Sequence, residues 1–220
     1  TPRVQAGADS AIMHTLDAFG LHWDDTVIYQ SQRLACYQAV FNRLQQQDAL
    51  YGCQCSRKEI SASGGLYTGT CAHLHLTQEP LAWRLHANSV ACHFNDLVFG
   101  KQHINPTLAA EDYTVKRRDG LFSYQLVVVI DDIEQQITEV IRGADLLTMT
   151  PRQQHLCQLL GYPAPRYGHL PLAVSTPGHK LSKQNHASAL ENWPLSHSLA
   201  AALTLLGHKP PTTLIQAPVQ

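Results

Sequence analysis

The sequence predicts a layered α/β protein that is interrupted by a small β-rich insert. Two helical patterns come first, before residue 50. Residues 51–120 then combine an irregular stretch rich in cysteine, serine and glycine with several strand-like runs. After residue 121, strand-like and helical runs alternate. Strands that alternate with helices around a β-rich segment are typical of an α/β fold with an insertion.

The composition is that of an ordinary globular protein. The 220 residues, 44% hydrophobic and 15% charged, can bury one sizeable core and exclude a disordered or fibrous chain. No apolar run approaches the roughly 18 residues of a membrane-spanning helix, and the first ten residues lack the pattern of a secretory leader. We therefore expect a cytoplasmic protein with no membrane partner. The net charge of -1 means that a polyanion would need a local cluster such as "KRR" at 116–118.

Two structural helices are predicted at the start of the chain. Apolar residues recur at helical spacing over residues 4–19, and Gly20 follows as a C-terminal cap. The second helix begins near Ser31, which we expect to be its N-cap. The apolar face of this second helix has four members: Leu34, Tyr37, Phe41 and Leu44.

The middle of the chain is predicted to form strands. The runs "LAWRLHA" (81–87) and "VACHFNDLVFG" (90–100) are strand-like. In "YTVKRRDGLFSY" (113–124), Asp119 and Gly120 mark a hairpin turn between two such runs. The next run, "YQLVVVIDD", is either a buried strand or a buried helix, because periodicity does not separate the two.

The last third alternates between strands and helices. "TEVIRGADLL" (138–147) predicts a strand and a turn, and "HLPLAV" (169–174) a further strand. Between them, "TPRQQHLCQLLG" predicts a helix with Thr150 as its cap, Pro151 at its first position and Gly161 beyond its end. "SHSLAAALTLLG" (196–207) predicts the final helix.

Cysteines cluster where a hydrophobic core is lacking. Cys53 and Cys55 lie two apart, and Cys71 follows a glycine-bearing turn. Three thiolates and one further ligand would complete a tetrahedral zinc site, which stabilises a segment of this kind and leaves no open position for catalysis. Three free cysteines or a redox pair are the alternatives, although CxC lacks the usual redox spacing. The candidates for the fourth ligand are Tyr67, His73 and His75.

A small basic loop, "GHKLSKQNHA" (178–187), places Lys180 and Lys183 on either side of a serine. A lysine ammonium is suited to bind a phosphate, and two such groups could stabilise the negative charge that develops on a triphosphate. Gly178 would let the loop move. The competing interpretation is an ordinary surface pattern.

With the predicted strand before it, "KLSKQN" resembles the KMSKS signature of class I aminoacyl-tRNA synthetases, with leucine and glutamine replacing the usual methionine and final serine. Further stretches are similar to glutamyl-tRNA synthetases, and more closely to their shortened branch, the glutamyl-Q tRNA(Asp) synthetases. The resemblance covers nearly the whole chain in order. It implies a Rossmann-type catalytic domain with an inserted zinc-binding subdomain and a C-terminal helical segment. The stretches are "GLHWDD", "YQSQR", "RRDGLFSYQLVVVIDD", "TEVIRGADLL" and "RYGHLPLA".

The resemblance also implies roles for single residues. Tyr124 and Arg142 would bind glutamate, since an arginine fork can hold a carboxylate and a phenol can hydrogen-bond the same ligand. Lys183 would bind ATP during catalysis, with Lys180 as its weaker companion. Without the resemblance, Tyr124 is a core aromatic and Arg142 a surface ion-pair residue. The implied ligands of a structural zinc ion are Cys53, Cys55, Tyr67 and Cys71.

Three departures from the family pattern are visible. The HIGH signature of class I enzymes is absent, so we expect a chain cut by roughly 40 to 50 residues before Thr1, since its βαβ unit alone takes about 30. Fewer than forty residues follow the lysine loop, so we expect no large anticodon-binding domains. Val128 stands where the conventional enzymes tend to have asparagine, which predicts weaker or altered glutamate binding.

The resemblance therefore implies a ligase that activates L-glutamate with ATP and transfers the glutamyl group to queuosine in tRNA(Asp). The alternatives are a minimal synthetase that charges tRNA(Glu) and a noncatalytic RNA-binding module that zinc stabilises and that has lost its first catalytic motif. We expect a monomer, with Lys183 and Arg142 facing one cavity. The predicted segments are 1–50 (helical part of the nucleotide-binding domain), 51–120 (insert), 121–175 (second half of that domain) and 176–220 (lysine loop and helices).

Overall fold

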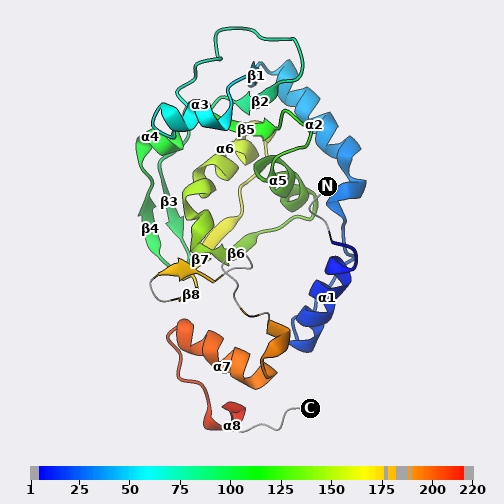
Figure 1. The fold of residues 1–220 in the computed structure, drawn as a ribbon, viewed down its shortest axis with the longest axis vertical. Coiled ribbons are helices and arrows are strands. Elements are labelled where there is room, and N and C mark those ends of the chain that lie inside the picture. Colours follow the sequence, from blue (N-terminus) through cyan, green and yellow to red (C-terminus); the bar gives the residue numbers. More distant parts are fainter. Residues whose placement is uncertain (1–4, 176–177, 182–187, 189, 216–220) are drawn as a thin grey trace. The chain divides into compact units, whose positions relative to one another are not determined.

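The structure is a computed structural model that describes residues 5–175, 178–181, 188 and 190–215. The chain divides into two compact units, drawn in Figure 1. One unit is Tyr29–Leu170, and the other combines Thr1–Ile28 with Pro171–Gln220. The four segments expected from the sequence remain a prediction.

The larger unit contains two sheets. The first is antiparallel, has the order β1-β2-β5, and consists of β1 (Leu50–Cys53), β2 (Ala82–Leu85) and β5 (Tyr113–Lys116). The second has the order β4-β3-β7-β6, and its strands are β3 (His93–Asp96), β4 (Gly100–His103), β6 (Glu139–Gly143) and β7 (Arg166–Leu170). In this sheet β7 runs parallel to both β3 and β6, while β3 and β4 form an antiparallel hairpin.

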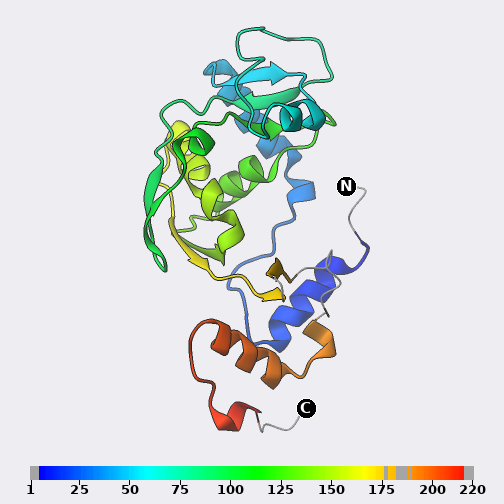
Figure 2. The ribbon, with the colours of Figure 1, turned by 60° about the vertical axis from the view of Figure 1, so that its left-hand side comes forward.

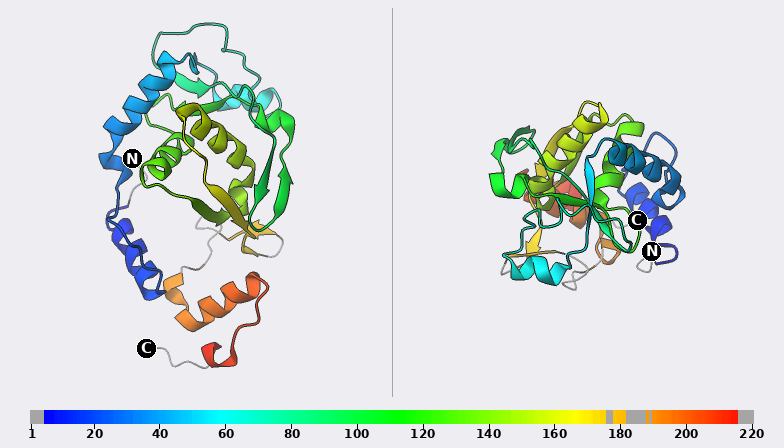
Figure 3. Two further views of the ribbon diagram at one scale, coloured as in Figure 1. Left: turned by 180° about the vertical axis from the view of Figure 1, so that it is seen from behind. Right: turned by 90° about the horizontal axis from the view of Figure 1, so that it is seen from above.

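Helices α5 and α6 pack against each other in the middle of the larger unit, and α2 packs on α5 (Figures 1 and 3). The helices of this unit are η1 (Gln30–Gln32), α2 (Leu34–Gln46), α3 (Arg57–Ala62), α4 (Pro106–Ala109), α5 (Tyr124–Glu134), η2 (Ala144–Met149) and α6 (Thr150–Leu160).

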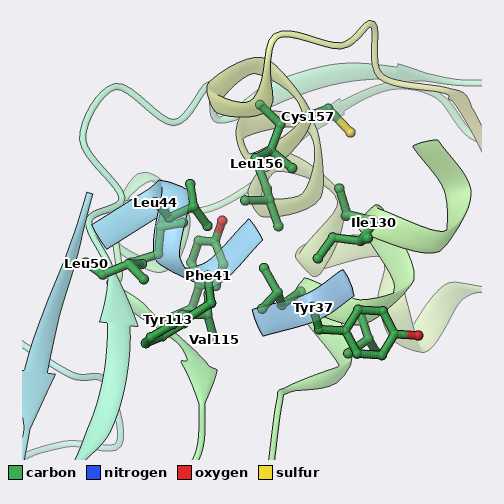
Figure 4. Close-up of a cluster of buried hydrophobic side chains, with 14 residues drawn as sticks. Tyr37, Phe41, Leu44, Leu50, Tyr113, Val115, Ile130, Leu156 and Cys157 are labelled. Carbon is green, nitrogen blue, oxygen red and sulfur yellow. The ribbon is translucent and has the colours of Figure 1, made fainter. Parts of the chain in front are cut away.

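The main core joins α2, α5 and α6 to the first sheet (Figure 4). Leu44 of α2, Val115 of β5, Leu126 of α5 and Leu156 of α6 are fully buried in it. Burial of such side chains stabilises each by about 1.5–3 kcal/mol. The core therefore fixes the start of α5 relative to the first sheet.

The smaller unit is mainly helical (Figure 2). Helix α7 packs against α8, and β8 pairs with β9 in a short antiparallel hairpin. Its elements are α1 (Ala8–Ala18), β8 (Val174–Ser175), β9 (His179–Lys180), η4 (Leu190–Asn192), α7 (Leu195–Leu205) and α8 (Thr212–Ile215). Among the described residues of the whole chain, no helix has the length and apolarity needed to cross a membrane.

Several helix predictions need correction at their starts. Helix α1 begins at Ala8, and none of its residues is buried. Ser31 lies in a 3-10 turn, and Arg33 is the N-cap of α2. Thr150 is the first residue of α6 instead of its cap, a shift of one residue that fraying helix ends often show.

Local signals also misled the strand predictions. The segment after Gly120 supplies only an isolated bridge between Lys116 and Phe122, because the chain enters α5 directly at Tyr124. The ambiguous run 124–132 is therefore helical. The predicted strand 169–174 is split, since β7 ends at Leu170 and Pro171 has no N–H to continue the ladder. The strand-like run 90–100 forms a strand only over residues 93–96, and β4, which begins at Gly100, was not predicted as a separate strand.

Candidate active site and metal centre

The three cysteines are brought together at the end of β1. Cys53 is the last residue of that strand, and Cys55 follows just before α3. A side chain at Gly52 would lie 2.7 Å from the carbonyl oxygen of Leu76, so only glycine allows the chain to approach so closely. A capping box between Ser56 and Glu59 starts α3 directly after Cys55. Local structure thus fixes the first two thiols, and the long loop returns the third.

The sulfur positions suit a zinc ion. The Sγ atoms of Cys53, Cys55 and Cys71 all lie within 4.8 Å of one another, and those of Cys55 and Cys71 are 3.5 Å apart. In a tetrahedral site with Zn–S bonds of about 2.3 Å, the sulfurs lie about 3.8 Å apart. The donor set and its spacing therefore fit zinc.

The acidities of the thiols show why the cluster suits a cation. Burial raises the pKa of Cys55 to about 12, and its hydrogen bond with Cys71 adds to the effect. Burial also opposes ionisation of Cys71, but hydrogen bonds from the Gln54 backbone and from Cys55 and Tyr67 hold its pKa below the usual value. The three thiols cannot all ionise side by side without a compensating cation.

Tyr67 lies beside the cluster, whereas the histidine candidates do not join it. The buried Tyr67 hydroxyl accepts a hydrogen bond from the backbone N–H of Cys71 at 2.8 Å. Burial is the main cause that raises the pKa of this phenol. Among the described histidine, cysteine, aspartate and glutamate residues, the ligand group around these sulfurs contains only the cysteines, and His73 and His75 are exposed. Tyr67 as the fourth ligand remains a prediction.

A buried arginine, Arg84 of β2, lies against the same cluster. Its Nε donates to Cys53 Sγ at 3.3 Å, and its Nη1 donates to the carbonyl oxygen of Asp112 at 2.7 Å. Its guanidinium carbon lies 3.7 Å from the centroid of the Tyr67 ring. Among the described residues, no carboxylate lies within ion-pair distance of Arg84. The guanidinium therefore faces sulfur, which can carry charge only as thiolate.

Arg142, the predicted glutamate-binding arginine, lies on β6 at the centre of a polar network. Its Nε donates to His169 Nε2 at 3.0 Å and its Nη1 to Gln153 Oε1 at 2.6 Å. Its Nη2 donates to Thr150 Oγ1 at 2.8 Å, and the guanidinium carbon lies 4.8 Å from the ring centroid of Tyr167. The side chain is only partly buried. Its orientation is thus fixed by neutral groups.

Tyr124, the second predicted glutamate contact, is the first residue of α5 and is 49% exposed. Its neighbour Gln125 accepts a hydrogen bond from Gln153 at 2.9 Å, and Gln153 in turn contacts Arg142. The helix start and the arginine therefore share one hydrogen-bonded chain. Val128 is partly buried against the main core, and its effect on glutamate binding remains a prediction.

The lysine loop belongs to the smaller unit. Lys180 lies in β9, whose Cα register pairs it with Val174 of β8, and Gly178 has the positive φ of 95° that favours glycine. Lys183 lies outside the described residues. The shared cavity expected for Lys183 and Arg142, and the roles of both lysines, therefore remain predictions.

The basic residues at 116–118 are engaged locally. Lys116 Nζ donates to Gln38 at 3.2 Å and lies over the rings of Phe41 and Phe122. Arg117 pairs with Asp119, and Arg118 donates to the Gln54 carbonyl. These contacts weaken the case for this cluster as a separate polyanion site.

Sequence reasoning missed several residues of these sites. Thr150, Gln153 and His169 contact Arg142 in the structure, Asp96 contacts His169, and Arg84 faces the thiols. These polar side chains occur in runs that are otherwise typical of buried elements, and that pattern could have indicated buried hydrogen-bonding residues. Asp96 in "FNDLVFG" and His169 in "YGHLPLA" are of this kind.

Comparisons with known proteins agree on one family. Residues 1–212 match the model of the catalytic domain of class I tRNA synthetases (E and Q). The chain is 49% identical over 215 residues to the glutamyl-Q tRNA(Asp) synthetase of Photobacterium profundum, covering 98% of this chain and 69% of the relative. It is 50% identical over 206 residues to the enzyme of that name from Shewanella oneidensis, covering 94% of this chain and 69% of the relative.

Solved structures show the same fold. A glutamate tRNA ligase from Elizabethkingia meningosepticum, in complex with its amino acid, matches with a TM-score of 0.68 and 26% identity. A glutamate-tRNA synthetase from Elizabethkingia anophelis matches with a TM-score of 0.69 and 26% identity. The matches cover 84% of this chain, and 43% and 44% of the two solved chains. Taken with the relatives at about half identity, these matches mean that the chain belongs to the class I tRNA synthetases, in the branch of the glutamyl-Q tRNA(Asp) synthetases.

Proposed function

We propose that the protein activates L-glutamate with ATP and transfers the glutamyl group to the queuosine base at the wobble position of tRNA(Asp). In the first step a glutamate carboxylate oxygen attacks the α-phosphorus of ATP and pyrophosphate leaves. In the second step a hydroxyl of the queuosine ring attacks the carbonyl of the adenylate and AMP leaves. Because the substrate is a tRNA, we place the enzyme in the cytoplasm. The monomeric state expected from the sequence remains a prediction.

The unpaired charge of Arg142 carries this proposal. Among the described residues no carboxylate lies within ion-pair distance of its guanidinium, although Asp132 acts on it electrostatically from farther away. Its hydrogen-bond partners His169, Gln153 and Thr150 are neutral acceptors. A partly buried cation held in this way is suited to a carboxylate that comes from outside the protein. Glutamate supplies such a group, and Tyr124 at the start of α5 could reach the same ligand.

The remaining roles follow from the family pattern. Lys183 and, less strongly, Lys180 stabilise charge on the ATP phosphates, which is the main requirement of phosphate displacement. Cys53, Cys55, Cys71 and Tyr67 hold a structural zinc ion that fastens the insert. Zinc contributes folding free energy and takes no part in the chemical steps.

Labelled glutamate transfer tests the acceptor. The full-length protein should incorporate glutamate into purified tRNA(Asp) that carries queuosine, and not into tRNA(Asp) that lacks it. Glutamate-dependent exchange of pyrophosphate into ATP reports the activation step separately. Charging of tRNA(Glu) alone would refute the proposed acceptor, and an absence of exchange would refute glutamate activation.

Lys183→Ala tests the phosphate role. We expect adenylate formation to slow far more than glutamate binding weakens, because the lysine acts on charge that develops on the phosphates. Lys180→Ala should have a smaller effect of the same kind. Equal losses in rate and in glutamate affinity would contradict this assignment.

A further inference from the structure

The β3–β4 hairpin of the insert supplies a residue to the network around Arg142. Asp96 ends β3, and its Oδ2 lies 2.6 Å from Nδ1 of His169 on β7. Both side chains are fully buried. The strands approach closely here because Gly168 has no side chain, and a Cβ at that position would lie 3.2 Å from Cβ of Leu97. The insert and the second half of the catalytic domain thus meet directly behind Arg142.

The hydrogen bonds define the tautomer of His169. Arginine Nε can only donate, so at 3.0 Å from Arg142 Nε the His169 Nε2 must accept and carries no hydrogen. The ring proton is therefore on Nδ1 and is donated to Asp96. A doubly protonated ring would set two donors against each other.

Asp96 is suited to hold this proton arrangement. Its Oδ1 accepts backbone N–H groups from Val98 and Phe99 at 2.9 Å and from His169 at 3.2 Å. Burial by itself would raise the pKa of Asp96, but the hydrogen bonds from Phe99, His169 and Val98 lower it below its usual range. The group therefore stays a carboxylate and accepts from Nδ1.

These hydrogen bonds determine which N–H groups of the Arg142 guanidinium remain available to a ligand. Of the five N–H groups of an arginine, three in Arg142 are taken by His169, Gln153 and Thr150. The two that remain sit one on each terminal nitrogen, and the one on Nη2 meets only the Leu146 carbonyl at 3.4 Å. A carboxylate can therefore be bound end-on by the free N–H groups of Nη1 and Nη2. It cannot be bound through Nε, because the Nε N–H is donated to His169.

We propose that Asp96 and His169 are positioning residues, which turn Arg142 so that its terminal nitrogens meet a carboxylate of the substrate. This inference rests on the proposed binding of glutamate by Arg142. It assigns the β3–β4 hairpin a part in amino acid recognition. The pair acts through Arg142 and does not touch the substrate.

Two substitutions of His169 separate the halves of its role. His169→Gln can keep an acceptor toward Arg142 Nε but loses the donor to Asp96. His169→Asn can keep the donor to Asp96 but loses the acceptor. We expect His169→Asn to raise the KM for glutamate by at least about tenfold, because small misplacements of a binding group are costly. His169→Gln, which loses only the anchoring by Asp96, should raise this KM less, by about threefold, and the KM for ATP should be unchanged in both.

Glutamate-dependent pyrophosphate exchange measures these constants, with the thermal midpoint recorded for each variant. Equal glutamate KM values for the two variants, or a parallel rise in the KM for ATP, would overturn the proposal. If the wild-type enzyme shows no exchange with glutamate, the proposed function fails instead, so the two failures are distinguishable.

A measurement on the wild-type protein tests the tautomer of His169 even if the variants do not fold. The ¹⁵N spectrum of histidine-labelled protein should show one ring with Nδ1 protonated and Nε2 unprotonated, and His169→Gln or His169→Asn assigns it by its loss in whichever variant folds. Should neither fold, Arg142→Lys should shift that Nε2 signal, since it removes the Nε donor. An Nε2-protonated or doubly protonated His169 would refute the inference.

Discussion

Replacing Arg84 by methionine tests whether the thiol cluster of the insert holds a cation. Arg84 is only 7% exposed, and among the described residues its charge faces no carboxylate at ion-pair distance. Its hydrogen bonds to described residues go to the Asp112 carbonyl and to Cys53 Sγ, at 3.3 Å, and of these two partners only the sulfur can carry negative charge. Burial of an unpaired cation costs several kcal/mol, so the arrangement is favourable only when the sulfur is a thiolate.

The size of the effect follows from these contacts. A zinc ion with three thiolates keeps a net negative charge, which the guanidinium of Arg84 can neutralise. Loss of an outer hydrogen-bonding partner typically lowers metal affinity 10- to 100-fold. This range corresponds to about 1.4–2.7 kcal/mol. Methionine keeps much of the side-chain volume and removes both the charge and the donors, so packing should change little.

Competition with a chelator of known affinity measures zinc binding by the wild type and Arg84→Met. Arg118→Met is the matched control, because this exposed arginine donates to the Gln54 carbonyl in the same loop and contacts no sulfur. Without zinc, Arg84→Met should be at least as stable as the wild type, since it no longer buries an unpaired charge. Zinc affinity equal to that of Arg118→Met, or a large loss of stability without zinc, would refute this reasoning.

Three further predictions concern stability. Leu126→Ala should lower the free energy of unfolding by about 2–5 kcal/mol in urea titrations, since Leu126 is fully buried in the main core, and a loss below about 1 kcal/mol would contradict its packing there. Burial raises the pKa of Asp132 to about 6, so its carboxyl binds a proton more tightly in the folded state, and the stability this contributes at pH 4 is lost as the pH rises through about 6. Asp132→Asn should therefore be more stable than the wild type at pH 8 by at most about 3 kcal/mol and nearly equal at pH 4, and the opposite trend in denaturant titrations would exclude the raised pKa. Cys71→Ser should reduce the zinc content measured by atomic absorption and lower the thermal midpoint, whereas an unchanged metal content would remove the zinc proposal.

The sequence by itself determined the elements whose signals are local. The apolar spacing of Leu34, Tyr37, Phe41 and Leu44 predicted α2, although Leu34 at its start is exposed. Pro151 and Gly161 bounded α6 within a residue. The spacing of Cys53, Cys55 and Cys71 predicted a metal cluster, and the structure brings these sulfurs together. Each of these signals depends on neighbours along the chain, so it can be read without knowledge of the fold.

Only the tertiary structure decided which distant groups share a site. Periodicity could not settle whether residues 124–132 form a strand or a helix, because the apolar residues 126–130 are continuous and show no alternation with polar ones. Asp96, His169 and Arg142 come from three strands far apart in the sequence, and their contacts arise from the parallel pairing of β7 with β3 and β6. The partner of Arg84 is likewise set by the register of β2 on β1, which no local pattern encodes.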